Sequence, residues 1–218
     1  MNSTEHFTVL IGSCARGTDQ PHSDVDVVRV GHDSELLRAD LGRKGLAKLA
    51  QGPTAYVDYD LATFARLFDE GSLFVHHILT EGILLDGPRS IWNAWRASFR
   101  VANSFLQETV RYSASSFWLL HPERFVHARL PFLSHLFRAM KNTAIFSLAN
   151  RHTYCFEKRD CLCQAFPAML KEDIDLLLAA DAAYQRAVPE VAPVLVEHQT
   201  DIFYSKFCTR LAEALASR

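Results

Sequence analysis

Two aspartates separated by one residue are the part of this chain whose types and spacing best suit chemistry. Asp24 and Asp26 open an apolar run that ends at Val30, and on a β-strand the period of two directs both carboxylates to one face. Two negative charges so close together repel, and a divalent cation removes that repulsion. Because Mg²⁺ prefers one or two carboxylates with phosphate oxygens and waters, the spacing predicts a magnesium site. Taken alone, Asp-x-Asp more often marks only a turn and the start of a strand.

A turn suited to phosphate precedes the two aspartates. The apolar run Phe7–Ile11 predicts a buried strand that ends at Gly12, and Val25–Val30 predicts a second one beside it. Gly12 has no side chain to keep a ligand away, and Ser13 offers a hydroxyl and a backbone N–H. Arg16 adds a cation to the same loop. These residues are therefore candidate ligands of phosphate oxygens.

Together these motifs resemble the signature of a known superfamily. Gly12-Ser13, Ala15-Arg16-Gly17 and Ser23-Asp24-Val25-Asp26 resemble the Gly-Ser, Arg-Gly and Ser-Asp-x-Asp motifs of polymerase-beta-type nucleotidyltransferases, especially the minimal and aminoglycoside-modifying branches. The loop between the motifs fits that pattern without an insertion. The resemblance covers about the first 90 residues of the chain and extends no further.

The resemblance implies a reaction and a set of metal ligands. Such enzymes transfer a nucleoside monophosphate from a nucleoside triphosphate to an acceptor hydroxyl, with two Mg²⁺ ions neutralising the reacting phosphates. Asp24 and Asp26 would hold both ions. A third carboxylate in the family comes from a neighbouring strand, and Asp58 is the residue onto which that role is carried. The alternative is that Asp58 is a turn residue and the third ligand lies elsewhere.

Further elements complete the predicted catalytic domain. Residues 54–59 predict a third strand, and Asp60 is a good N-cap for the helix that follows. The pattern also predicts a second helix that ends at Gly82 and a short strand after it. His76, His77 and Glu81 on that helix are interpreted as structural. The segment from Gly31 to Gly52 predicts a short or interrupted helix.

The predicted fold class is α+β, with a small mixed sheet followed by a helical bundle. Gly87-Pro88 is taken as the boundary, which gives a catalytic domain of residues 1–88 and a helical domain of residues 89–218. Amphipathic patterns predict four or more helices there, one of them running from Phe99 to Phe117. The helical domain is expected to bind the acceptor or a partner.

Composition narrows the functional class. The chain has 218 residues, 49% of them hydrophobic, and a net charge of −2, so nucleic acid is not an expected partner. No apolar run reaches the roughly 18 residues that a membrane span needs. The short polar segment before Phe7 and five irregularly spaced cysteines predict a cytoplasmic protein with reduced thiols.

The sequence leaves the acceptor open. A small molecule such as an aminoglycoside-like antibiotic is the first expectation, and a protein side chain, as in antitoxin-type nucleotidyltransferases, is the second. A nucleotide-binding module that has lost catalysis is a third. Since only about six residues precede the first strand, one sheet face needs another cover, which is a weak indication of a homo-oligomer.

Overall fold

The computed structural model describes residues 6–19, 23–31, 54–114, 121–186 and 201–216. The chain divides into two compact units, an N-terminal unit of Met1–Ala102 and a helical unit of Asn103–Arg218. The short helix predicted between Gly31 and Gly52 lies almost wholly outside the described residues. The beginning of the last predicted helix, around Val191, lies outside them too.

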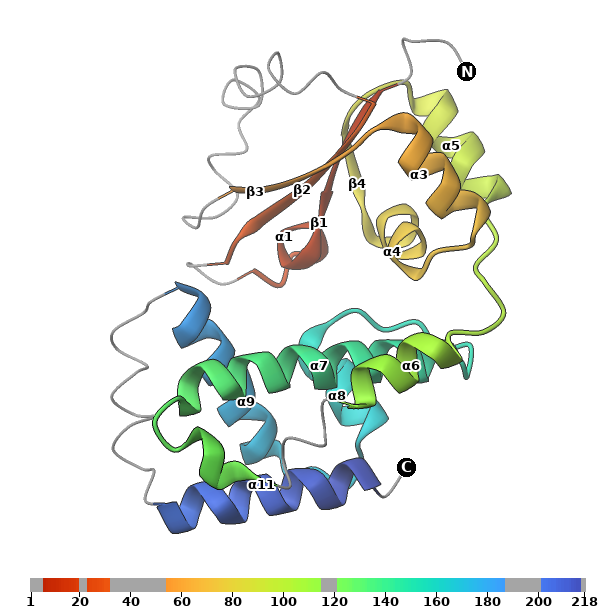
Figure 1. The fold of residues 1–218 in the computed structure, drawn as a ribbon. Helices are drawn as coiled ribbons and strands as arrows, with labels where there is room; N and C mark the ends of the chain where they lie inside the picture. The colour runs from red at the N-terminus through yellow and green to blue at the C-terminus, as the bar shows by residue number, and fades with distance from the viewer. Residues whose placement is uncertain (1–5, 20–22, 32–53, 115–120, 187–200, 217–218) are drawn as a thin grey trace. The chain divides into compact units, whose positions relative to one another are not determined.

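A four-stranded mixed sheet forms the centre of the N-terminal unit (Figure 1). Its order is β3-β2-β1-β4, and its members are β1 (Phe7–Ile11), β2 (Val25–Val30), β3 (Thr54–Tyr59) and β4 (Ile83–Asp86). β1 pairs antiparallel with both β2 and β4, whereas β2 and β3 run parallel. The strands predicted on either side of the Gly-Ser turn are therefore confirmed, and they are direct neighbours in the sheet.

Three helices pack on one face of this sheet, because alternate residues of β1 and β2 present apolar side chains to it. These helices are α3 (Leu61–Asp69), α4 (Leu73–Glu81) and α5 (Arg89–Ser98). The buried core between sheet and helices includes Phe7, Val9, Ile11, Val28, Val30, Phe64, Val75, Ile78 and Trp92. On the opposite face, Cys14 of the short helix α1 (Gly12–Arg16) packs with Leu10, Val25 and Val27.

The boundary between the units falls after Ala102, not after Pro88 as predicted. The reason is the aromatic packing of α5. Phe7 of β1 lies edge-on to both Trp92 and Trp95, with ring centroids 5.7 and 5.4 Å apart. Trp95 also stacks on Phe64 at 5.1 Å. The helix assigned to the bundle from its pattern therefore belongs to the core of the sheet domain.

Every described element of the second unit is a helix, and together with the mixed sheet of the N-terminal unit this confirms the α+β fold class. Its described elements are α6 (Leu106–Ser113), the 3-10 helix η3 (Pro122–Phe125), α7 (Arg129–Ala149), α8 (Lys158–Ala165), α9 (Lys171–Arg186) and α11 (Asp201–Ala216). The long helix α7 lies at the centre of a core that includes Leu133, Phe137, Met140, Ala144, Leu162, Ile174, Leu177 and Phe207. The helix predicted from Phe99 to Phe117 is wrong at its start, since α5 ends at Ser98 and α6 begins at Leu106.

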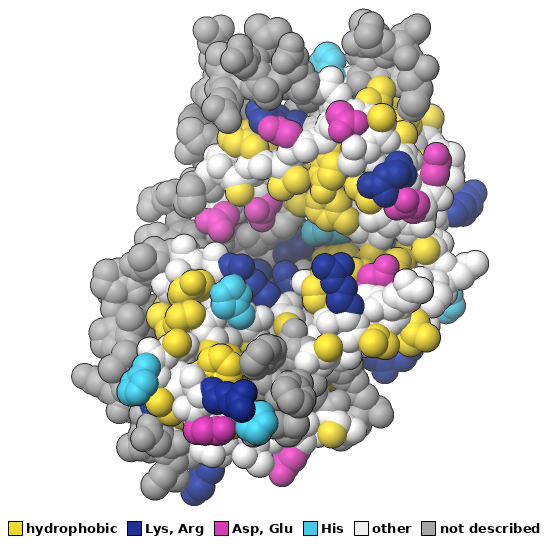
Figure 2. Space-filling model, in the orientation of Figure 1, with side chains coloured by type: hydrophobic (Ala, Val, Ile, Leu, Met, Phe, Trp, Pro, Cys, Tyr) yellow, Lys and Arg dark blue, Asp and Glu magenta, His cyan; other side chains and the backbone are white. Residues whose placement is uncertain are grey.

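Several large hydrophobic side chains stay exposed, and yellow patches mark side chains of this type on the visible face in Figure 2. Leu106 and Val110 on α6 are 63% and 59% exposed, so the stripe read from the sequence does not face a core among the described residues. No described helix is both long enough and apolar enough to cross a lipid bilayer.

Candidate active site

The turn after β1 brings the glycine of the Gly-Ser motif against an aspartate of the Asp-x-Asp motif. Gly12 begins α1 with φ +75°, a left-handed conformation that glycine adopts without strain. A Cβ placed on Gly12 would lie 2.6 Å from Oδ2 of Asp26. The bare backbone of the turn and the Asp26 carboxylate therefore meet directly.

The pairing of β1 with β2 positions the two aspartates. Asp26 is the second residue of β2 and lies opposite Ile11, the last residue of β1. Asp24 directly precedes the strand, and the Cys14 thiol donates to its backbone carbonyl over 3.4 Å. Both aspartates are half-buried. α1 thus holds the start of β2 in place, and the antiparallel register carries Asp26 to the Gly-Ser turn.

A further carboxylate, Asp19, contributes charge to the same region. Burial raises the pKa of the Cys14 thiol, and the charges of Asp19 and Asp26 raise it further, with a smaller effect from Asp24. The thiol therefore stays protonated beside three carboxylates. Sequence reasoning missed Asp19, although an acidic residue between the two motifs was a visible signal.

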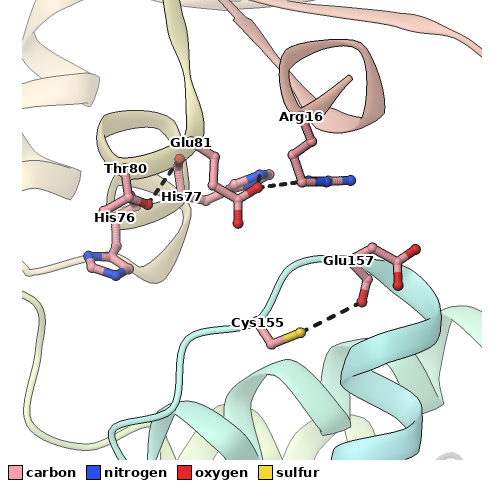
Figure 3. A network of polar contacts seen from close by, with 7 residues as sticks. All are labelled: Arg16, His76, His77, Thr80, Glu81, Cys155 and Glu157. Atoms are coloured by element: carbon pink, nitrogen blue, oxygen red, sulfur yellow. Dashed lines mark hydrogen bonds and ion pairs between the residues drawn. The ribbon is translucent and has the colours of Figure 1, made fainter. Parts of the chain in front are cut away.

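Arg16, predicted as a phosphate contact, forms a network with α4 (Figure 3). Its Nη1 donates to Oε2 of Glu81 over 2.8 Å, and Nε2 of His77 lies 3.2 Å from the same oxygen. Burial by itself raises the pKa of Glu81, but hydrogen bonds from His77 and Arg16 outweigh burial and hold the pKa below its ordinary value. The Arg16–Glu81 ion pair thus ties α1 to α4, whereas the His77–Glu81 contact lies within α4. The structural role of His77 and Glu81 stays a prediction. The ion pair with Glu81 also compensates part of the Arg16 charge.

Asp58 does not join the other two aspartates. In the parallel pairing of β3 with β2, Asp26 lies opposite Ala55 and Arg29 lies opposite Asp58. Because Asp26 and Arg29 are three residues apart, an odd number, their side chains point to opposite faces of the sheet. The Asp58 carboxylate accepts hydrogen bonds from Nε and Nη2 of Arg29. The expected cage of Asp24, Asp26 and Asp58 is therefore not formed, and the prediction for Asp58 is corrected to a structural ion pair.

Arg29 is a residue whose importance the sequence pattern hid. Its side chain is 1% exposed, whereas that of Asp58 is 48% exposed. Its guanidinium carbon also lies 4.5 Å from the ring centroid of Tyr56. The available signal was a single arginine in the otherwise apolar run that follows Asp26. A buried cation at that position requires a carboxylate nearby, and the next strand supplies one.

The donor set fits a magnesium ion better than a transition metal. Asp24 and Asp26 offer carboxylate oxygens, which Mg²⁺ prefers, and the adjacent Gly12 leaves open the space that a side chain would fill. Within the described ranges, no group of three or more His, Cys, Asp and Glu residues has the geometry to hold a metal ion. Among the described residues, Asp24 and Asp26 would thus supply two carboxylates, and phosphate oxygens and waters could serve as further ligands.

No protein-family model matches the chain, and no curated protein or solved structure is significantly similar to it. The interpretation of the site therefore depends on its residues and their geometry.

Gly12→Ala is expected to lower both stability and nucleotide affinity. A non-glycine residue in the left-handed region costs roughly 1–2 kcal/mol, and the added Cβ would also displace the Asp26 carboxylate. Gly17→Ala is the matched control, because Gly17 has φ +69° with no atom within 4 Å of an added Cβ. Urea unfolding and calorimetric titration with Mg²⁺ and triphosphate should show the strain in both variants and the loss of affinity in Gly12→Ala alone. Equal affinities in the two variants would mean that the turn does not contact the nucleotide.

Acidification is expected to destabilise the N-terminal unit through His76. Burial lowers the pKa of His76 below its ordinary 6.5, and the charge of His77 lowers it further, against an opposing effect of Glu81. The unfolded chain therefore binds a proton at a pH where the folded chain does not, and stability declines as pH falls below 6.5. Urea unfolding across this range, followed by tryptophan fluorescence, should show the decline in the wild type and in a His127→Gln control. A His76→Gln variant with an unchanged decline would refute this assignment.

Proposed function

We propose that the protein is a Mg²⁺-dependent nucleotidyltransferase of the polymerase-beta type. It would transfer a nucleoside monophosphate from a nucleoside triphosphate to an acceptor hydroxyl and release pyrophosphate. The observation that carries this proposal is the direct approach of the Asp26 carboxylate to the bare backbone of Gly12. That approach combines a metal ligand with a surface on which phosphate oxygens can lie.

The residues of the chain would contribute binding and orientation. Gly12 and Ser13 would donate backbone N–H groups and a hydroxyl to the β and γ phosphates, and Asp24 and Asp26 would hold Mg²⁺. The metal, when bound, neutralises phosphate charge and stabilises the leaving pyrophosphate. Phosphoryl chemistry of this kind depends on positioning and charge more than on a protein nucleophile. The acceptor oxygen forms the new bond to the α phosphorus as the bond to pyrophosphate breaks, and the acceptor proton leaves to solvent.

The acceptor is proposed to be a small molecule with a free hydroxyl, such as an aminoglycoside-like compound. A protein hydroxyl is the alternative within the same chemistry. The four proposed site residues would bind phosphate or metal, so they would not select the acceptor by its shape. These residues are Gly12, Ser13, Asp24 and Asp26. Acceptor choice is therefore assigned to the helical unit.

A specific observation favours a second candidate function, a nucleotide-binding module without transfer activity. Asp58 is bound to Arg29 on the other face of the sheet, so Asp58 does not supply the third carboxylate that the resemblance implies. With two carboxylates the site can still bind a Mg²⁺–triphosphate complex. The two candidates thus agree on the ligand and differ on the chemistry.

One experiment separates them. The protein is incubated with each α-labelled triphosphate and Mg²⁺, in the presence of either a cell lysate or a panel of hydroxyl-bearing metabolites, with Asp26→Asn in parallel. Label that reaches a small molecule or a protein with the wild type alone supports transfer and identifies the acceptor class. Binding of labelled triphosphate without transfer under any condition favours the binding module, and the absence of both contradicts the two candidates together.

A further inference from the structure

A cluster of three cations and one carboxylate lies within the helical unit, apart from the residues of the candidate active site. Arg138 and Lys141 are one turn apart on α7, Lys158 is at the start of α8, and Asp181 belongs to α9. Nε of Arg138 lies 3.5 Å from Oδ1 of Asp181, and Nζ of Lys158 lies 3.8 Å from Oδ2. Three separate helices thus converge on one carboxylate.

Asp181 is buried and already well supplied with partners. Its side chain is 9% exposed, and its Oδ1 accepts a hydrogen bond of 2.8 Å from the hydroxyl of Ser134, which is itself fully buried. The amide of Gln185 donates to that hydroxyl over 3.4 Å. The carboxylate is therefore a fixed anchor for the cations around it.

Lys141 makes the charge of the cluster unbalanced. Burial lowers the pKa of its ammonium, and the neighbouring charges of Lys158 and Arg138 also lower it, while Asp181 raises it. The nearby Cys161 adds no negative charge at neutral pH, because burial raises its pKa to about 12. Three cations against one carboxylate leave two excess positive charges among these residues. Like charges held together in a half-buried environment are unfavourable unless an anion joins them.

Two of the three cations, Arg138 and Lys158, are placed where a ligand can reach them, whereas Lys141 is half-buried. The side chains of Arg138 and Lys158 are 44% and 49% exposed, and their separations from Asp181 are longer than those of tight hydrogen-bonded ion pairs. A guanidinium and two ammonium groups are the donors that bind phosphate best in proteins. An anion at this surface would face several donors, and the one carboxylate among them, Asp181, already accepts a hydrogen bond from Ser134.

We propose that Arg138, Lys141 and Lys158 form a binding site for the phosphate group of a small molecule. Asp181 is the resident carboxylate that keeps the three cations together when the ligand is absent. This site is independent of the Mg²⁺ site proposed for Asp24 and Asp26, and it needs no divalent cation.

Thermal unfolding of the full chain in the presence of EDTA tests the proposal. Inorganic phosphate and ribose 5-phosphate are the probes, and sodium chloride at equal ionic strength is the reference. Either probe should raise Tm beyond the chloride reference. A larger effect of ribose 5-phosphate identifies an organic phosphate as the ligand, equal effects identify the free anion, and both results support the site.

Variants then locate the effect. Lys141→Met should raise Tm without ligand, because it removes a poorly compensated buried charge, and should weaken the apparent affinity for the probe about tenfold or more. Lys158→Gln should weaken the apparent affinity for the probe similarly. Lys171 is an exposed lysine on α9, and Lys171→Gln should leave that affinity unchanged. Asp26→Asn should show the same rise in Tm with each phosphate probe as the wild type. The proposal is overturned if neither probe exceeds chloride, or if Lys141→Met and Lys158→Gln respond like the wild type.

Discussion

Asp26→Asn is expected to lower Mg²⁺-dependent triphosphate turnover about 100-fold or more while leaving the fold intact. The amide has the shape of the carboxylate and can keep its place beside Gly12, but it lacks the charge that holds the metal. Metal stabilisation of phosphoryl transfer is worth several kcal/mol, and about 1.4 kcal/mol corresponds to a tenfold change in rate. Release of pyrophosphate is the measurement.

Asp69→Asn is the matched control for this substitution. Asp69 is an exposed aspartate at the end of α3 in the same unit, so the change in charge and composition is the same. The control should retain wild-type turnover. Undiminished turnover in Asp26→Asn, with circular dichroism showing a folded protein, would contradict the assignment of Asp26.

Asp58→Ala is expected to destabilise the N-terminal unit by about 2 kcal/mol. Removing one partner of a fully buried ion pair costs about 3–5 kcal/mol, because the other charge is left uncompensated. Arg29 is buried, but half of the Asp58 side chain is exposed. Water therefore screens the pair, and the expected loss of stability is smaller than for a fully buried pair. Urea unfolding measures the loss.

The double variant Arg29→Met with Asp58→Ala decides the role of Asp58. Without the arginine no buried charge is left, so stability should recover most of the loss. The double variant should also bind Mg²⁺ and triphosphate like the wild type, because Asp58 points away from Asp26. A folded double variant that no longer binds the metal–nucleotide complex would show that Asp58 is a ligand after all.

The sequence was informative where a local pattern determines the structure. Strong apolar runs bounded by Gly12 and by Asp24 predicted two buried neighbouring strands, and both are present. Asp60 was predicted as an N-cap, and its carboxylate accepts the backbone N–H of Thr63 over 2.7 Å. The approach of Gly12 to Asp26 also follows from local signals, since Gly12 directly follows one strand and Asp26 is the second residue of the next.

The errors concern contacts between segments distant in the chain. Which face Asp58 takes depends on the register of β3 against β2, and a shift of one residue would reverse it. The alternation within each strand leaves that register undetermined. Similarly, the apolar stripe of α5 fits a bundle as well as a sheet, and only the packing of Trp95 on Phe7 and Phe64 decides between them.

Calorimetric titration with each of the four nucleoside triphosphates tests the metal–phosphate site most directly. We expect at least one triphosphate to bind in the presence of Mg²⁺, with binding lost in EDTA and in Asp26→Asn but retained in Asp69→Asn. Binding of equal strength with and without Mg²⁺, or undiminished binding by Asp26→Asn, would contradict the claim that Asp24 and Asp26 hold a magnesium ion beside the Gly12 turn.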